Sequence, residues 1–286
     1  MSFSLSPILV RLAGDAPSLS LVVLRTFFSI VILAPFAIAR EGKAMLQLTR
    51  KEISVIVVAG VLLGFHFFIF FEAIRLTTVA SATVFISLTP IFLGLLGFVF
   101  LKERLSVYVV IGIVFAVIGG LMIAYGDSGA DVQAVNAPLG NLLALVGCVM
   151  VSLYLLIGRV ARQNISFLAY IFPMYGVATF SMIIVALVTG TPLFGLGGRI
   201  YFLCILMAIF PQLIGHGSFN FSIKFFPAAI LGLLSLTEPI GSTIMAYFIF
   251  DELPGTWSLI GMGVTLCAVS FALLPGLLKA KKETPV

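Results

Sequence analysis

The feature that most constrains this chain is a series of long apolar runs separated only by short polar loops. A helix rises about 1.5 Å per residue, so about 20 mostly apolar residues cross the roughly 30 Å hydrocarbon core of a bilayer. Helices satisfy their own backbone hydrogen bonds in lipid, whereas barrel strands would alternate apolar and polar residues over about ten positions. We therefore expect membrane helices near 2–13, 19–39, 53–74, 78–100, 106–125, 139–158, 167–188, 200–222, 228–250 and 256–275.

Composition excludes several classes of protein. Hydrophobic residues make up 61% of the 286 residues and charged residues 9%, against about 45–50% and 25% in soluble proteins. This excludes a soluble enzyme, a disordered chain and a nucleic-acid-binding domain, and the net charge of +5 is spread over short loops. Cys148, Cys204 and Cys267 lie far apart inside apolar runs, so we expect no disulfide, metal site or cofactor.

The basic residues orient the predicted bundle. With both termini in the cytoplasm, 12 of the 16 Lys and Arg residues face that side, as the positive-inside rule requires. Arg75 and Arg199 remain on the other side. The first run reaches only about 20 Å, so either it does not span fully or the natural chain begins before Met1.

The two halves of the chain match when one is shifted by 149 residues. The matches are Pro90 with Pro239, Ile91 with Ile240, Glu103 with Glu252, Gly112 with Gly261, and Ile74-Arg75 with Ile223-Lys224. Five helices per half is an odd number, so the second half enters the membrane the opposite way up, as in many secondary transporters. The predicted fold is all-α and integral to the membrane, with ten transmembrane helices in a 5+5 inverted-topology repeat. The predicted parts are a first repeat at 1–126, an outer linker at 127–138, a second repeat at 139–278 and a basic cytoplasmic tail at 279–286.

Short motifs recur in order along nearly the whole chain. They are Ser6-Pro7-Ile8 with Arg11, Arg25, Pro90 with Leu101-Lys102-Glu103 and Gly112, and Glu238-Pro239 with Asp251-Glu252 and Gly261. With these residues the chain resembles the drug/metabolite transporter superfamily, EamA-type branch. The resemblance implies a ten-helix transporter of the bacterial inner membrane, typically an exporter of amino acids or other small metabolites. The first helix is shorter than is usual in that family.

Glu238 is the leading candidate for a transport residue. It lies near the middle of its predicted span, where an ionisable group is costly and usually faces a cavity or a partner. Pro239 lacks an N–H donor and can break the helix beside it. Glu238 could neutralise a substrate ammonium, carry a proton, or be a hydrogen-bonded structural carboxyl.

Polar residues also recur on other predicted helices. Gln212, His216 and Asn220 are spaced by four and form one stripe, which either faces a cavity or makes bonds between helices. His66 lies mid-span among phenylalanines and is either a ligand or a packing residue. Gly60 and Gly64 form a GxxxG pattern that close helix packing explains.

Arg25 is a candidate ligand for a substrate carboxylate. It can snorkel outward or pair with Asp15, or it can face the cavity and bind a carboxylate. In the last case Arg25 and Glu238 would hold the two ends of an amino acid.

The remaining candidates lie on the predicted fourth and ninth spans. Pro90 mirrors Pro239 as a second helix break, Ser87 lies one turn away, and Thr89 stands where the second half has Glu238. Tyr247 is deeper than an interfacial aromatic belt needs. Glu103 and Glu252 lie in loops, where local capping or pairing explains them.

The combined prediction is a secondary-active or facilitative transporter that moves amino acids or related amines outward by alternating access. Its partners would be a small-molecule substrate, the lipid bilayer and, as a second candidate, protons; the oligomeric state is left open. The alternatives are a membrane-embedded enzyme, and a channel or scaffold. No GxSxG, HExxH or nucleotide-binding GxxxxGK[ST] motif is present.

Overall fold

A computed structural model describes residues 2–77, 79–86, 88–103, 105–127, 135–226, 228–251 and 255–283. Every regular element in these ranges is helical, which confirms the all-α fold class. The elements are α1 (Leu5–Leu12), α2 (Ser18–Leu46), α3 (Arg50–Leu76), α4 (Val79–Ile86), α5 (Thr89–Leu101), α6 (Val107–Asp127), α7 (Ala137–Ala161), α8 (Phe167–Thr189), α9 (Gly198–Met207), η1 (Ala208–His216), α10 (Gly217–Ser222), α11 (Ala228–Ser235), α12 (Thr237–Phe250) and α13 (Thr256–Glu283).

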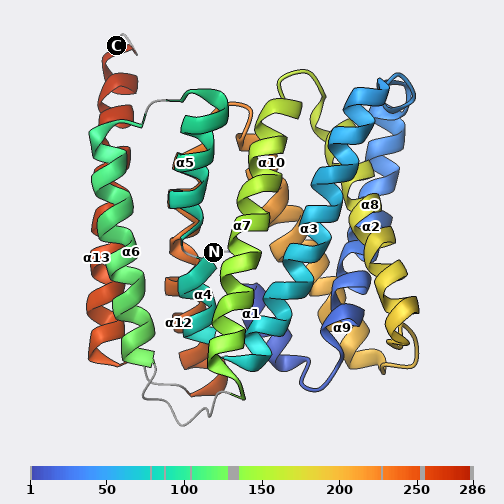
Figure 1. Cartoon of the computed structure of the whole chain (residues 1–286), viewed down its shortest axis with the longest axis horizontal. Helices are drawn as coiled ribbons and strands as arrows, with labels where there is room; N and C mark the ends of the chain where they lie inside the picture. Colours follow the sequence, from blue (N-terminus) through green and yellow to red (C-terminus); the bar gives the residue numbers. More distant parts are fainter. Residues whose placement is uncertain are drawn as a thin grey trace.

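The helices stand side by side and are joined by loops at two opposite ends (Figure 1). Six helical stretches in the described residues are long and apolar enough to cross a membrane, so the protein is a multi-pass membrane protein. These stretches are Ser18–Leu46, Arg50–Leu76, Ala137–Ala161, Phe167–Thr189, Gly198–Ser222 and Ile230–Phe250. Shorter apolar helices cover Thr89–Leu101, Val107–Met122 and Leu259–Ala272.

Three of the predicted helices are not regular along their whole length. The fourth is divided into α4 and α5, and the ninth is divided into α11 and α12 at Leu236. The eighth passes through the π-helical segment η1, which contains Pro211. Proline has no N–H to donate, and π-helix, whose hydrogen bonds skip one more residue than in an α-helix, is rare and often found at functional sites.

The ends of the chain differ from the simplest expectation. Helix α1 has eight residues, which is about 12 Å of helix, and it lies in the lower half of the bundle as drawn in Figure 1. Helix α13 runs to Glu283, so most of the predicted tail at 279–286 continues this helix. In the predicted linker, residues 128–134 lie outside the described part.

Helices α3 and α7 pack together in the middle of the bundle, α6 and α13 pack together at one edge, and α2 and α8 pack together at the opposite edge (Figure 1). Gly60 allows the close approach of α3 and α8, since a Cβ atom there would lie 2.6 Å from the carbonyl oxygen of Met174. Close packing therefore accounts for Gly60 in the GxxxG pattern.

Two backbone features occur at matching positions in the two halves. Lys102 and Asp251 follow α5 and α12 with φ of 54° and 56°, and they are 149 residues apart. The N–H groups at these two caps donate to the carbonyl oxygens of Gly97 and Ala246, which are also 149 residues apart. The α4–α5 and α11–α12 interruptions match in the same way.

Candidate substrate-binding cavity

A partly open cavity lies among the helices of the bundle. Its lining residues come from α1 with the turn before it, α2, α3, α4, α5, α7, η1, α10, α11 and α12: Phe3, Ser6, Arg25, His66, Phe67, Phe70, Ile86, Thr89, Val151, Leu155, His216, Phe219, Ser235 and Glu238. The centre of a water molecule can occupy about 50 Å³ of it. Because one water needs about 10–15 Å³ by this measure, the cavity has room for a few waters, and a larger solute needs the walls to move.

Arg25 forms one side of the cavity and is only 1% exposed. Its Nε donates to Gln212 Oε1 at 2.8 Å and its Nη1 donates to Ser6 Oγ at 3.3 Å. The guanidinium carbon lies 4.0 Å from the centre of the Phe67 ring, which is a cation–π contact. Its Nη2 has no hydrogen-bond partner among the described residues. Arg25 therefore points into the protein, and it neither snorkels outward nor pairs with Asp15.

His216 is held by hydrogen bonds behind the cavity wall. Its Nδ1 lies 3.0 Å from the hydroxyl of Tyr154 on α7. Asn220 Nδ2 donates to the same hydroxyl at 3.2 Å and to the His216 carbonyl oxygen at 2.8 Å. Phe3 and Phe67 pack edge-on against the imidazole, with ring centroids 4.8 and 4.9 Å away. The position of this ring is thus fixed on several sides.

His66 lies across the cavity on α3. Its Nδ1 lies 2.8 Å from the carbonyl oxygen of Gly147 on α7. The ring is parallel to that of Phe70, with centroids 6.1 Å apart and planes 4° apart. The centroids of the His66 and His216 rings are 6.3 Å apart. The two imidazoles therefore face one small space from different halves of the chain.

Glu238 lies in the first turn of α12, directly after the interruption at Leu236. A helix N-terminus favours a negative charge, so the break supplies a suitable position for a carboxyl. Glu238 is 9% exposed and lines the cavity, and it is close enough to Arg25 for Coulombic attraction. The hydroxyl of Ser242 donates to the carbonyl oxygen of Glu238 at 2.9 Å.

The structure brings together most of the residues that the sequence singled out. Arg25, His66, His216 and Glu238 line the cavity, and Gln212 and Asn220 contact its lining residues from behind.

Three further predictions have a different outcome or lie outside the description. Tyr247 does not line this cavity: it is 40% exposed and packs against Phe248, so depth along the helix gave the wrong face. Ser87 lies outside the described residues. Pro90 and Pro239 lie in the first turns of α5 and α12, just after the two helix interruptions.

Several lining residues were not recognised from sequence. Phe3, Phe219, Ile86, Val151 and Leu155 are apolar, as are most residues around them, so their type carried no signal. The sequence match between the two halves could have indicated most of the residues that line the cavity. Five pairs of lining residues are separated by 149 positions: Ser6 with Leu155, Phe67 with His216, Phe70 with Phe219, Ile86 with Ser235, and Thr89 with Glu238.

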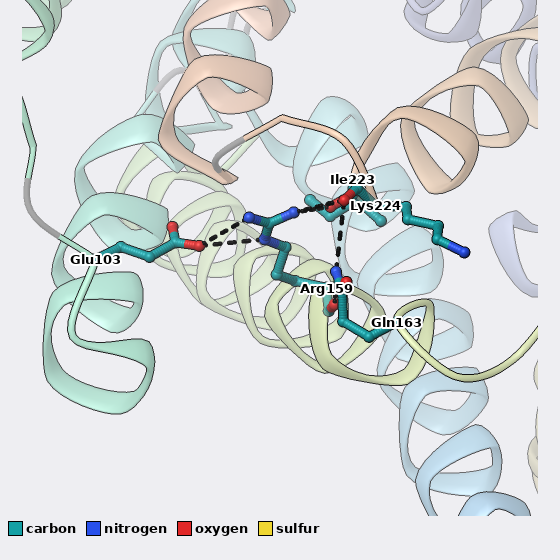
Figure 2. Close-up of polar contacts among 5 residues, drawn as sticks. All are labelled: Glu103, Arg159, Gln163, Ile223 and Lys224. Atoms are coloured by element: carbon teal, nitrogen blue, oxygen red, sulfur yellow. Dashed lines mark hydrogen bonds and ion pairs between the residues drawn. The ribbon is translucent and has the colours of Figure 1, made fainter.

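A second polar cluster closes one end of the bundle. Figure 2 shows Arg159, near the end of α7, between Glu103 on one side and Ile223 and Lys224 on the other. Glu103 lies two residues beyond the end of α5, and Ile223 and Lys224 follow α10. Its Nε and Nη2 both lie 3.1 Å from Glu103 Oε1, and its Nη1 donates to the carbonyl oxygens of Ile223 and Lys224 at 2.7 and 2.9 Å. Glu103 therefore pairs with a residue 56 positions away, and the expected local contact was wrong.

The comparisons with known proteins agree with this architecture. A solved crystal structure of a protein superimposes with a TM-score of 0.78 and 20% sequence identity, over 99% of this chain and 95% of that one. The uncharacterized transporter YyaM of Bacillus subtilis (strain 168) is 26% identical over 72% of this chain and 68% of its own length. An uncharacterized transporter of Clostridium kluyveri is 23% identical over 78% of this chain and 72% of its own length.

The family comparison covers almost all of the sequence. The EamA-like transporter family matches two segments, residues 1–125 and residues 138–274. The resemblance seen in the short motifs is thereby confirmed across both halves of the chain. This protein belongs to the EamA-like transporter family.

Proposed function

We propose that this protein is a secondary carrier that moves amino acids or related small amines across the bacterial inner membrane, and that it works as an exporter. The observation that carries the proposal is one cavity whose wall contains both Arg25 and Glu238. Helix α12, which positions Glu238, begins about halfway along the bundle (Figure 1). Charged groups at such a depth usually belong to a substrate or ion pathway.

The two charges suit the two ends of a zwitterion. Two donors of Arg25 are already used by Gln212 and Ser6, which fix the guanidinium. Its Nη2 has no hydrogen-bond partner in the described residues, so it is available to a substrate carboxylate, a group that Arg binds well. Glu238 would neutralise the ammonium group. An uncharged solute would leave both buried charges without this compensation.

The mechanism that we propose is alternating access in a ten-span, 5+5 inverted repeat made of residues 1–126 and 139–278. Support comes from the two family matches, the matching helix interruptions and caps, and the five cavity pairs related by 149 positions. Repeats of this kind can rock about a site near the membrane midplane. Basic residues such as Arg159 and Lys224 lie at the same end of the bundle, where α13 also ends (Figure 1), which supports a cytoplasmic location for that end.

The test is uptake of a panel of radiolabelled amino acids into proteoliposomes. Wild type should show saturable uptake, and Glu238→Gln should reduce it more than tenfold. Glu103→Gln is the matched control, because it neutralises a carboxyl at the end of the bundle, outside the cavity lining. Equal losses in the two variants would reject a special role for Glu238, and non-saturable uptake would indicate a channel.

The same vesicles separate facilitated diffusion from proton coupling. A pH-sensitive dye inside the vesicles should change in step with amino-acid flux if a proton moves with or against the substrate. Flux without a dye signal would leave the substrate gradient as the energy source. Absence of saturable uptake for every amino acid and amine tested would overturn the proposed substrate class.

A further inference from the structure

The two cavity histidines are bound through the same ring nitrogen but to different chemical groups. His66 Nδ1 contacts a backbone carbonyl oxygen, whereas His216 Nδ1 contacts a phenol hydroxyl. In a neutral imidazole one nitrogen is a donor and the other an acceptor, so the partner of Nδ1 decides what Nε2 offers. Both rings line the cavity. The fully buried side-chain atoms that lack a hydrogen-bond partner do not include either Nε2.

The tautomer of His66 follows from its partner. A carbonyl oxygen can only accept a hydrogen bond, so His66 must donate from Nδ1 to Gly147 at 2.8 Å. The neutral ring then has no proton on Nε2. His66 therefore offers a hydrogen-bond acceptor through Nε2.

The tautomer of His216 follows from the network behind it. The Asn220 amide donates to the Tyr154 oxygen, and among the described residues the remaining partner of this hydroxyl is His216 Nδ1. If Nδ1 were the donor, the buried Tyr154 proton would have no acceptor there, which costs about 1–3 kcal/mol. Tyr154 thus donates to Nδ1, and the proton of the neutral His216 ring is on Nε2.

We propose that Tyr154 and Asn220 are positioning residues that set His216 as a donor opposite His66 as an acceptor, and that this pair selects substrates with a hydroxyl or carboxamide group. Such a group can accept from His216 and donate to His66 at the same time. A methyl group of the same size would leave both ring nitrogens without partners. The part of the proposal that concerns substrates rests on the proposed function; the assignment of the tautomers does not.

The tautomers can be tested without any transport assay. The chain contains two histidines, so ¹⁵N-histidine labelling of the full-length protein gives two imidazole signals in an NMR spectrum. We expect one ring protonated on Nδ1 and the other on Nε2, and Tyr154→Phe should alter the second ring. Two rings with the same tautomer, or a doubly protonated ring, would overturn the assignment.

Tyr170→Phe is the matched control for Tyr154→Phe. Tyr170 is also fully buried, but its hydroxyl has no hydrogen-bond partner among the described residues. This variant should leave both histidine signals unchanged. An equal change in both variants would show that the spectrum reports general packing and would reject the positioning role.

Selectivity is tested with two isosteric pairs, L-threonine with L-valine and L-asparagine with L-leucine. In wild-type proteoliposomes the polar member should have at least a tenfold higher kcat/KM. Tyr154→Phe should reduce that ratio to about threefold or less while valine uptake is retained, whereas a merely structural loss would lower all four rates together. An unchanged ratio in this variant would overturn the proposal, and so would uptake of other amino acids with none of these four transported. Absence of uptake for every amino acid and amine tested would instead contradict the proposed function.

Discussion

Helix α3 and the α9–η1–α10 segment occupy matching positions in the two halves but are built differently. Helix α3 is regular over 27 residues, whereas its counterpart passes through nine residues of π-helix with Pro211 inside. At one matched position of the cavity wall α3 carries Phe67 and the counterpart carries His216. At this matched position one copy thus provides an aromatic ring on regular backbone, and the other provides an imidazole on irregular backbone. The comparison shows that positions 149 residues apart in this chain can carry different backbone and different side chains on the cavity wall.

The largest effect on stability is expected when a proline like Pro211 of η1 is introduced at the matching position of α3. Leu62 on α3 stands 149 positions before Pro211. Leu62→Pro should destabilise the protein by about 3 kcal/mol or more, because proline in a regular helix removes a hydrogen bond and clashes with the preceding turn. Pro211→Leu should have a much smaller effect, because η1 already accommodates the missing donor.

Thermal unfolding followed with a thiol-reactive dye would measure both changes. Cys148 and Cys204 are buried and become reactive on unfolding, and Cys267, which is exposed, would be replaced by Ser in all variants. Similar shifts in the unfolding midpoint for the two substitutions would contradict the distinction between the regular and the π-helical copy.

The next effect concerns exchange of the paired wall residues. His216→Phe should reduce transport at least tenfold, because it removes a donor from the cavity and leaves the Tyr154 hydroxyl without its acceptor. Adding Phe67→His should not restore transport, because Arg25 would lose the ring on which it stacks and Tyr154 contacts the other wall. Initial uptake rates of wild type, His216→Phe and the double variant provide the measurement. Recovery of transport in the double variant would mean that the residues at positions 67 and 216 can be exchanged.

These differences show which parts of the molecule could be predicted from sequence. The helices followed from the apolar runs, because lipid requires internally bonded backbone. Arg25 and Glu238 were singled out from the sequence, because charged residues are rare inside a membrane segment. Phe3 and Phe219 could not be predicted as lining residues, because their side chains are apolar like most residues of a membrane helix. The π-helix was not predicted either, because Pro211 alone does not indicate it: Pro35 and Pro173 lie inside regular α-helices.

A smaller effect is expected at the counterpart of Glu238. Thr89 also lines the cavity, and its hydroxyl is bonded to the carbonyl oxygen of Ile86 at 2.5 Å. Thr89→Val keeps the shape of the side chain, so transport should fall threefold or less, against a loss of more than tenfold for Glu238→Gln. The same uptake assay compares them. Equal losses would show that the two matched positions have equal roles.

The smallest effect is expected outside the cavity, at the Glu103–Arg159 ion pair. Both side chains are partly exposed, and such pairs contribute about 0–1 kcal/mol. Glu103→Gln should therefore shift stability by less than about 1 kcal/mol and leave the uptake rate within about twofold of wild type. Arg159→Gln should cost more stability, since Arg159 also binds the carbonyl oxygens of Ile223 and Lys224. A larger effect at Glu103 than at Arg159 would contradict this ranking.

The Thr89–Glu238 pair also bears on how a substrate is oriented. Two identical half-chains assembled as a dimer would hold either no carboxyl or two at this pair of positions, because each change would appear twice. A continuous chain can hold one, and here it has a hydroxyl on one wall and a carboxyl on the other. A bound molecule with one positive end would then have a single preferred orientation, toward α12, whichever side of the membrane it entered from. It would cross the membrane without having to turn over.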